Sequence, residues 1–138
     1  MRMTLALLAT AMAAAPALAA DPVTIKVAMT GAAEVPAGDP DGTGTASVTI
    51  DAAKGQVCYT LSVAGIDTAT MAHIHKGAAG VAGPVVVPLD PPATGSSTGC
   101  KPVDPAVIAA ILATPSDYYV NIHNAAFPKG ALRGQLGG

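Results

Sequence analysis

Hydrophobic and polar residues alternate along several short stretches of this chain, which is the pattern of β-strands with one buried face. In residues 23–30, Val, Ile, Val and Met alternate with Thr, Lys, Ala and Thr. Residues 45–50 and 56–63 are predicted to be two further strands, joined into a hairpin by a turn at 51–55. We also predict strands around the histidines at 73 and 75, and at 85–87, 118–123 and 131–136. The run at 85–87 is wholly apolar, which predicts a strand covered on both sides.

Glycine, proline, serine and aspartate dominate the connections between these stretches. They predict an ordered surface loop at 31–44, which carries Glu34, and another loop at 88–102. The second loop contains Gly95-Ser-Ser-Thr-Gly99, which matches the G-x-S-x-G motif of hydrolases by letter. That motif requires a strand that turns sharply into a helix, so we interpret the match here as chance composition.

One short helix is predicted at residues 106–113, where apolar residues recur at helical spacing. Asp104 suits the N-cap, Pro105 suits the first helical position, and Thr114-Pro115 ends the helix. Several short strands and one small helix together predict an all-β fold, an antiparallel Greek-key β-sandwich with the helix packed on its edge.

The first twenty residues have the layout of a secretory signal peptide. Arg2 precedes an apolar run that ends near Ala15, and Ala17-Leu-Ala19 forms a small-residue cleavage site. We therefore predict a signal at residues 1–20, a single domain at 21–138, a periplasmic or secreted location, and no membrane span after cleavage. The formal net charge of -2, the absence of Trp and the one Phe argue against nucleic acid as a partner.

Two cysteines, Cys58 and Cys100, are present in the whole chain. An exported protein meets an oxidising compartment, which favours a structural disulfide between them. A thiolate metal ligand or a redox pair is the weaker hypothesis, because the sequence has no C-x-x-C motif.

The candidate chemistry lies with the three histidines of the chain. In an extended strand His73 and His75 share one face, and His123 shares a face with Tyr119 and Asn121. If the two strands are neighbours, the three imidazoles converge into a site for copper or zinc. Met71 lies on the same strand face as His73 and could be a soft fourth ligand that favours Cu(I), and Glu34 or Asn121 could support the ligands.

Four sequence elements, in order, resemble the CHRD domain family. They are Gly31-Ala-Ala-Glu-Val-Pro36, Ala72-His-Ile-His-Lys-Gly-Ala-Ala-Gly-Val-Ala-Gly-Pro-Val85, Tyr119-Val-Asn-Ile-His123 and Pro128-Lys-Gly-Ala-Leu-Arg-Gly-Gln-Leu136. The resemblance implies a β-sandwich and an extracellular setting, whereas the activity of the family is poorly defined. Two positions depart from the family pattern: Ala131 replaces a glutamate, and Asn124 replaces a Thr or Ser. The role of that glutamate is either lost here or supplied by Glu34.

Our main hypothesis is an exported, non-enzymatic binding module that holds one copper or zinc ion through His73, His75 and His123. The alternative is a structural or protein-interaction module of the cell envelope, with an unidentified partner. In that case the histidines bind loop backbones, and Asn121 and Arg133 pin the glycine loop and the closing strand.

An enzyme is the weaker alternative. Copper-zinc superoxide dismutase is similar in its β-sandwich, H-x-H strand, glycine loop and disulfide, but its two-metal site needs more imidazoles than the three present here. A blue-copper site would need Cys58 as a free thiol, contrary to the expected disulfide.

Overall fold

The fold is described by a computed structural model for residues 10–15 and 20–138. Most of the predicted signal segment lies outside these residues, and so does its predicted cleavage site. Within the described ranges, we find no helix that is both long and apolar enough to cross a membrane.

The described residues form eight strands and one α-helix. The strands are β1 (Val23–Thr30), β2 (Thr43–Asp51), β3 (Gln56–Ala64), β4 (Ala69–Lys76), β5 (Val85–Leu89), β6 (Ser96–Pro102), β7 (Tyr118–Asn124) and β8 (Leu132–Gln135). The helix α1 (Pro105–Ala113) is followed by a 3-10 turn, η1 (Pro115–Asp117). The predicted all-β class is confirmed, and the alternating stretches at the first three strands lie where the sequence placed them.

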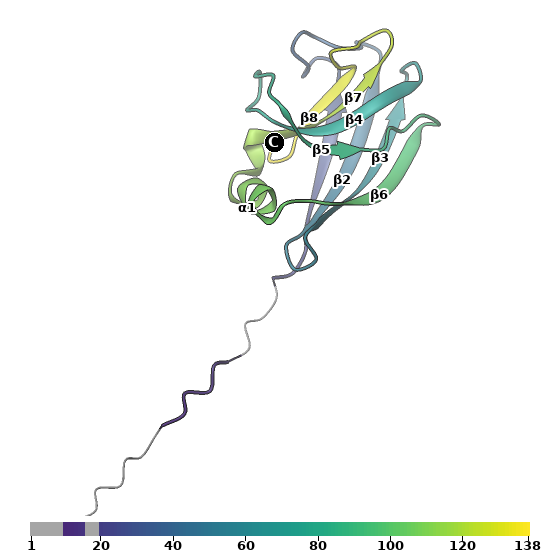
Figure 1. Ribbon diagram of the computed structural model, residues 1–138. Helices are drawn as coiled ribbons and strands as arrows, with labels where there is room; N and C mark the ends of the chain where they lie inside the picture. The colour runs from purple at the N-terminus through teal and green to yellow at the C-terminus, as the bar shows by residue number, and fades with distance from the viewer. Residues whose placement is uncertain (1–9, 16–19) are drawn as a thin grey trace, which may run out of the picture.

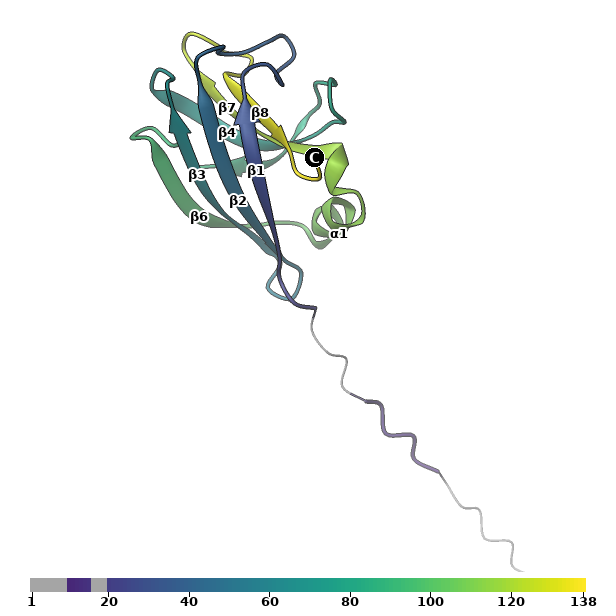
Figure 2. The same ribbon diagram turned by 180° about the vertical axis from the view of Figure 1, so that it is seen from behind.

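The strands pair antiparallel in the order β5-β4-β7-β8-β1-β2-β3-β6. This continuous sheet folds over on itself, so that the β1-β2-β3-β6 half faces the β5-β4-β7-β8 half (Figures 1 and 2). The two halves meet at β1 and β8, where Thr30 pairs with Arg133. The connections from β3 to β4, from β5 to β6 and from β6 to β7 cross between the halves, as in a Greek-key sandwich.

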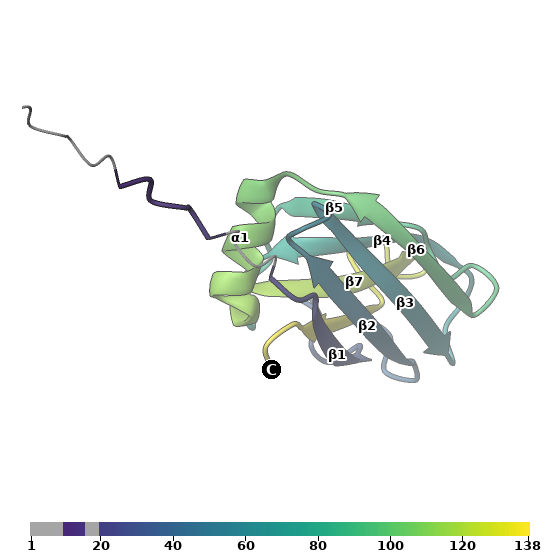
Figure 3. The same ribbon diagram turned by 90° about the horizontal axis from the view of Figure 1, so that it is seen from below.

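The inward-facing side chains of both halves form one apolar core. Alternation along each strand supplies it: Val48 and Ile50 from β2, Ile74 from β4 and Ile122 from β7 are all at most 1% exposed. The helix lies across one end of the sandwich (Figure 3) and adds Ile108 and Ile111 to this core.

Helix α1 begins as its sequence predicts. The Asp104 carboxylate accepts a 2.7 Å hydrogen bond from the Ala106 amide, and Pro105 occupies the first turn. The helix packs over the end of the sandwich rather than along an edge strand, because two of its isoleucines enter the core.

The prediction of a loop at 88–102 is partly wrong. Its second half forms β6, which pairs with β3 along its whole length. The strand was hidden because Ser, Thr and Gly replace the usual apolar residues and leave every position of β6 at least partly exposed. Val85 is 48% exposed, so β5 is not covered on both sides as its apolar sequence suggested.

The predicted disulfide is confirmed. Cys58 and Cys100 pair directly across β3 and β6, with their Cα atoms 3.9 Å apart, and together they form a disulfide. The bridge attaches β6, the last strand in the order, to its neighbour.

Asp90, the residue directly after β5, connects this end of the sheet to β3 and to β6 at the other end. The buried Tyr59 hydroxyl donates to the Asp90 carboxylate at 2.9 Å and accepts from the Asp90 amide at 3.0 Å. Lys101 forms an ion pair with the same carboxylate at 2.9 Å, and Ser97 donates to the Asp90 backbone oxygen. We refer to these contacts around Asp90 as the β5–β6 seam.

Candidate metal centre

A patch of polar side chains covers the outer face of β4, β7 and β8. In the β4–β7 ladder Met71 lies opposite His123, His73 opposite Asn121, and His75 opposite Tyr119. The β7–β8 ladder continues two of these rows, with Arg133 opposite Asn121 and Gln135 opposite Tyr119. Their sequence neighbours, such as Ile74 and Val120, point inward to the core.

This outer face is buried because loops fold over it. All seven residues of β7 are buried, although only alternate ones can face the core. The loop at 77–84, between β4 and β5, covers one end of the patch, and we name it the roof loop.

Arg133 and Gln135 hold the roof loop down. The Arg133 guanidinium donates to the backbone oxygens of Val81 and Ala78 at 2.9 and 2.8 Å. The Gln135 amide donates to the Gly77 oxygen at 3.0 Å. Arg133 is 2% exposed, so these carbonyl groups replace the water that its charge would otherwise need. The predicted role of Arg133 in pinning the glycine loop is confirmed.

The roof loop needs glycine where it comes closest to β4. A Cβ atom on Gly83 would overlap the backbone carbonyl of Lys76. The Lys76 amide donates to the Pro84 oxygen at 3.0 Å, so the two ends of the loop are held against each other. Gly83 thereby brings its own carbonyl group within hydrogen-bond distance of His75.

The three histidines converge. Each offers a ring nitrogen, and these nitrogen atoms all lie within 4.8 Å of one another. Around a tetrahedral ion with bonds of about 2.0 Å, ligand nitrogens lie about 3.3 Å apart, so small side-chain rotations would close the site. His75 and His123 are 8% and 7% exposed, and His73 is half-buried.

Loop carbonyl groups fix the orientation of two rings. His75 Nδ1 lies 2.8 Å from the Gly83 oxygen, and His123 Nδ1 lies 3.0 Å from the Pro128 oxygen. A carbonyl oxygen only accepts, so Nδ1 carries the proton in each ring, and in the neutral His75 ring Nε2 carries the lone pair. This is the arrangement in which protein metal sites usually hold their histidine ligands.

Two ring nitrogens in the cluster lack a partner. Among the described residues, the buried side-chain atoms without a hydrogen bond are His73 Nδ1, His75 Nε2 and Glu34 Oε1. His123 Nε2 lies 3.1 Å from Asn121 Oδ1, so both ring nitrogens of His123 have a hydrogen-bond partner. Unsatisfied buried nitrogens are unusual, and a metal ion would pair with them.

Burial favours the neutral form of His73 and His75. It lowers the pKa of His73, and the neighbouring His123 and His75 lower this pKa further. Burial also lowers the pKa of His75, although the hydrogen bond to Gly83 partly opposes the shift. Neutral imidazole is the metal-binding form, so protons compete with a metal ion here only under more acidic conditions than for a free histidine.

Glu34 lies at the margin of the patch. Burial raises its pKa from 4.5 to about 7, against the opposing effects of the Arg133 charge and of hydrogen bonds from Asn121 and the Val35 backbone. Its carboxylate packs where a side chain on Gly130 would lie. It therefore contacts the patch beside Asn121 and Arg133.

Aromatic stacking adds a connection that sequence reasoning missed. The rings of His75 and Tyr119 stack with centroids 4.8 Å apart, and the Arg133 guanidinium lies 3.4 Å from the Tyr119 centroid on the ring face. The Gly83 amide donates to the Tyr119 hydroxyl at 3.1 Å. Alternation along β7 places Tyr119 on the histidine face, which was the one available signal.

The other two candidate ligands from the sequence, Met71 and Cys58, have different positions in the fold. Met71 is on the same outer face but is 47% exposed. Cys58 is in the other half of the sandwich and is bound in the disulfide, so it offers no free thiol for a blue-copper site.

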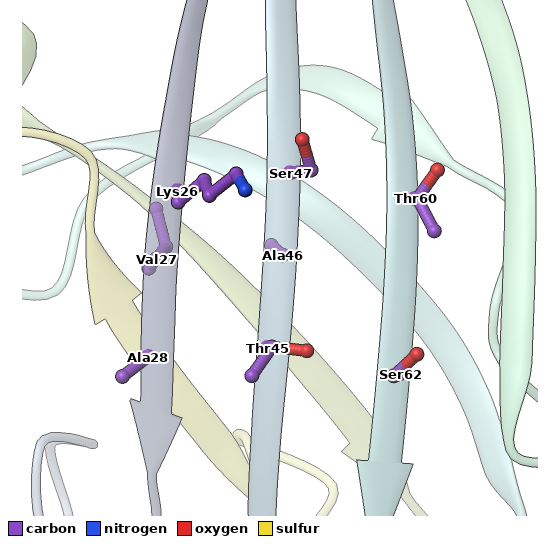
Figure 4. A pocket seen from close by; sticks show the side chains of 8 residues that line it. All are labelled: Lys26, Val27, Ala28, Thr45, Ala46, Ser47, Thr60 and Ser62. Carbon is purple, nitrogen blue, oxygen red and sulfur yellow. The ribbon is translucent and has the colours of Figure 1, made fainter.

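A separate hollow of about 450 Å³ lies on the β1-β2-β3 face (Figure 4). Figure 4 shows Lys26 and the hydroxyl groups of Thr45, Ser47, Thr60 and Ser62 along it. It is on the opposite half of the sandwich from the histidines, so the two features are independent.

A family model for the CHRD domain matches residues 25–136. The chain belongs to the CHRD family. A search of curated proteins and a search of solved structures found no match. In this CHRD domain the four sequence elements that carried the resemblance come together: the 31–36 loop, the histidine strand with the roof loop, β7 and the closing strand all border the outer-face patch.

The two departures from the family pattern have local explanations in this CHRD domain. Asn124 is buried and accepts a 2.8 Å hydrogen bond from the Phe127 amide, so it fixes the turn after β7. Ala131 is fully buried, and Glu34 is close enough to Arg133 for that charge to act on its pKa. Glu34 is thus placed to supply the carboxylate that position 131 lacks.

Proposed function

We propose that this CHRD domain is an exported, non-enzymatic binding module that holds one copper or zinc ion through His73, His75 and His123. Imidazole nitrogen suits both ions, and three histidines are the common ligand set of open metal sites. The fourth position would then be left for solvent or another ligand.

The observation that carries this proposal is the state of the ring nitrogens. Backbone carbonyl groups hold the Nδ1 atoms of His75 and His123, while His75 Nε2 and His73 Nδ1 are buried with no partner among the described residues. A purely structural histidine would be expected to satisfy both of its nitrogens.

A second candidate is an interaction module without metal. The hydrogen bonds from His75 to Gly83 and from His123 to Pro128 favour it, because they attach two loops to the sheet without any ion. The two candidates differ in the role of His73. Its Nδ1 binds neither loop, so only the metal site requires this residue.

An enzyme of the copper-zinc superoxide dismutase type has less support. The chain contains three histidines, which are too few for a site with two metal ions. Redox activity at a single bound copper ion would be a property of the copper-loaded protein, separate from the proposed binding function.

Export is part of the proposal. The apolar segment with a small-residue cleavage site precedes the domain, and the disulfide between Cys58 and Cys100 is typical of an oxidising compartment.

The test is a metal titration of the protein purified from the periplasm of a bacterial host with its disulfide intact. Zn(II), Cu(II) and ascorbate-maintained Cu(I) are each titrated against the wild type and against the variant with all three histidines changed to alanine. We expect one ion per chain, lost in the variant. No binding tighter than about micromolar would refute the proposal and leave the interaction module. The N-terminal residue of the exported protein, read by mass spectrometry, tests cleavage near residue 20.

A further inference from the structure

Met71 stands out from the patch by its exposure. Its neighbours on the outer face, His75, Asn121, His123 and Arg133, are all at most 8% exposed, whereas Met71 is 47% exposed. The other methionine of the sandwich, Met29, is 1% exposed in the core. A side chain that is 47% exposed gains only part of the stabilisation that full burial would give, so packing alone does not explain Met71.

The register places Met71 at the histidine cluster. It lies directly opposite His123 in the β4–β7 ladder and two residues before His73 on the same strand face. Directly opposed residues in an antiparallel pair have Cβ atoms about 5 Å apart, and residues two apart on a strand lie about 7 Å apart. A methionine with three rotatable side-chain bonds spans either distance.

Met71 also lies on the accessible side of the cluster. The roof loop covers the end of the patch that contains His75 and Tyr119, through the contacts of Gly83 with both side chains. His73, the next residue toward Met71 on this face, is the least buried of the three histidines. An ion from solvent would therefore reach the cluster past Met71 and His73.

Thioether sulfur has a marked metal preference. It is a soft, neutral ligand that suits Cu(I), and it adds little for Zn(II) or for Cu(II) in a site of nitrogen ligands. Met71 needs no deprotonation to bind. Its contribution therefore depends on the identity and oxidation state of the metal.

We infer that Met71 is the solvent-side fourth ligand of the cluster and makes it a site for Cu(I), with His73, His75 and His123 as the other three. This inference rests on the proposed function, and it narrows the choice between copper and zinc to the reduced copper ion. In the metal-free protein the Met71 side chain extends into solvent, and it folds over the cluster when Cu(I) binds.

The test compares Met71→Leu with the wild type. Leucine has nearly the volume of methionine and cannot bind copper, so the fold should be unaffected. Met29→Leu is the matched control, because it makes the same chemical change in the core. Cu(I) affinity is measured by competition with a chromophoric Cu(I) chelator, and Zn(II) affinity with a zinc dye.

We expect Met71→Leu to weaken Cu(I) binding by about tenfold or more and to change Zn(II) affinity by less than about twofold. Met29→Leu should change neither affinity. X-ray absorption of the Cu(I) protein should show one sulfur scatterer that is lost in Met71→Leu.

Equal Cu(I) affinity in Met71→Leu and wild type, with only nitrogen scatterers around the copper, would overturn the inference while leaving the three-histidine site intact. Equal losses for Cu(I) and Zn(II) would also overturn it, because that result indicates a general structural effect. A wild type that binds neither metal would instead refute the proposed function.

Discussion

His75 and Tyr119 lie opposite each other in the β4–β7 ladder, and their rings stack in parallel planes, 3° apart. The guanidinium of Arg133 rests on the Tyr119 ring, and the same guanidinium binds the roof loop. The ring of a candidate ligand, the sheet and the loop above it are therefore connected by one side chain of β8.

Arg133→Lys tests this connection. Lysine keeps the charge but cannot bind two separate carbonyl groups and lie flat on the ring at once. We expect a loss of about 2 kcal/mol in the free energy of unfolding, measured with urea, and faster hydrogen exchange at the Gly83 amide. Lys26→Arg, an exposed control on the other half of the sandwich, should change stability by less than about 0.5 kcal/mol. An unchanged exchange rate at Gly83 would show that the roof loop does not depend on Arg133.

Two histidine variants separate metal binding from structure. His73→Ala removes an unpaired nitrogen from a half-buried position, so we expect a stability change within about 1 kcal/mol. His123→Ala removes the bond to the Pro128 oxygen and should cost about 1–3 kcal/mol.

Both variants should lose metal binding, which the metal titrations measure. Thermal unfolding measures their stability. If His73→Ala binds the metal ion as tightly as the wild type, a site formed by all three histidines is excluded.

Glu34 should give the metal-free protein a pH-dependent stability. Its pKa is about 7 in the folded protein and near 4.5 when unfolded, so the folded state holds more protons between these values. Its contribution to stability is present below about pH 4.5, falls as the pH rises, and is lost above about pH 7.

Glu34→Gln removes this titration. We expect the variant to match the wild type near pH 4.5 and to be more stable by up to about 3 kcal/mol at pH 8, as measured by urea unfolding across the pH range. Asp67→Asn, at an exposed position, should show no such difference. A Glu34→Gln variant that is less stable than wild type at pH 8 would show that the ionised carboxylate stabilises the fold.

The disulfide should make a large contribution for a domain of this size. Cys58 and Cys100 are 42 residues apart, for which the chain-entropy model gives about 4 kcal/mol. We expect the Cys58→Ala/Cys100→Ala double variant to lose about this much in urea unfolding. Its metal affinity should be unchanged, because the bridge is in the other half of the sandwich. A fall in metal affinity without a fall in stability would contradict both expectations.

Alternation along the strands was enough to predict most of this fold. It placed the first three strands and correctly divided β7 into an inward face with Val120 and Ile122 and an outward face with Asn121 and His123. The same rule failed for β6, because a strand of Ser, Thr and Gly at the edge of a sheet buries too little apolar surface to leave a pattern.

The convergence of the histidines followed from sequence only on the condition that their strands pair. The structure meets this condition, since β4 and β7 are neighbours. The burial of the site could not be predicted, because it depends on Arg133 and Gln135 binding a loop more than 50 residues earlier in the chain. Local patterns carry no information about such contacts.

The β5–β6 seam has a consequence for how copies of this protein meet. The outermost strands of an open sheet present unpaired backbone groups that can recruit strands from other chains. Here Asp90, directly after β5, binds Tyr59 of β3 and Lys101 of β6, and Pro88 removes one amide from β5. A domain with so little apolar surface on β6 and such protected edges offers few positions where a strand of a second copy could be added.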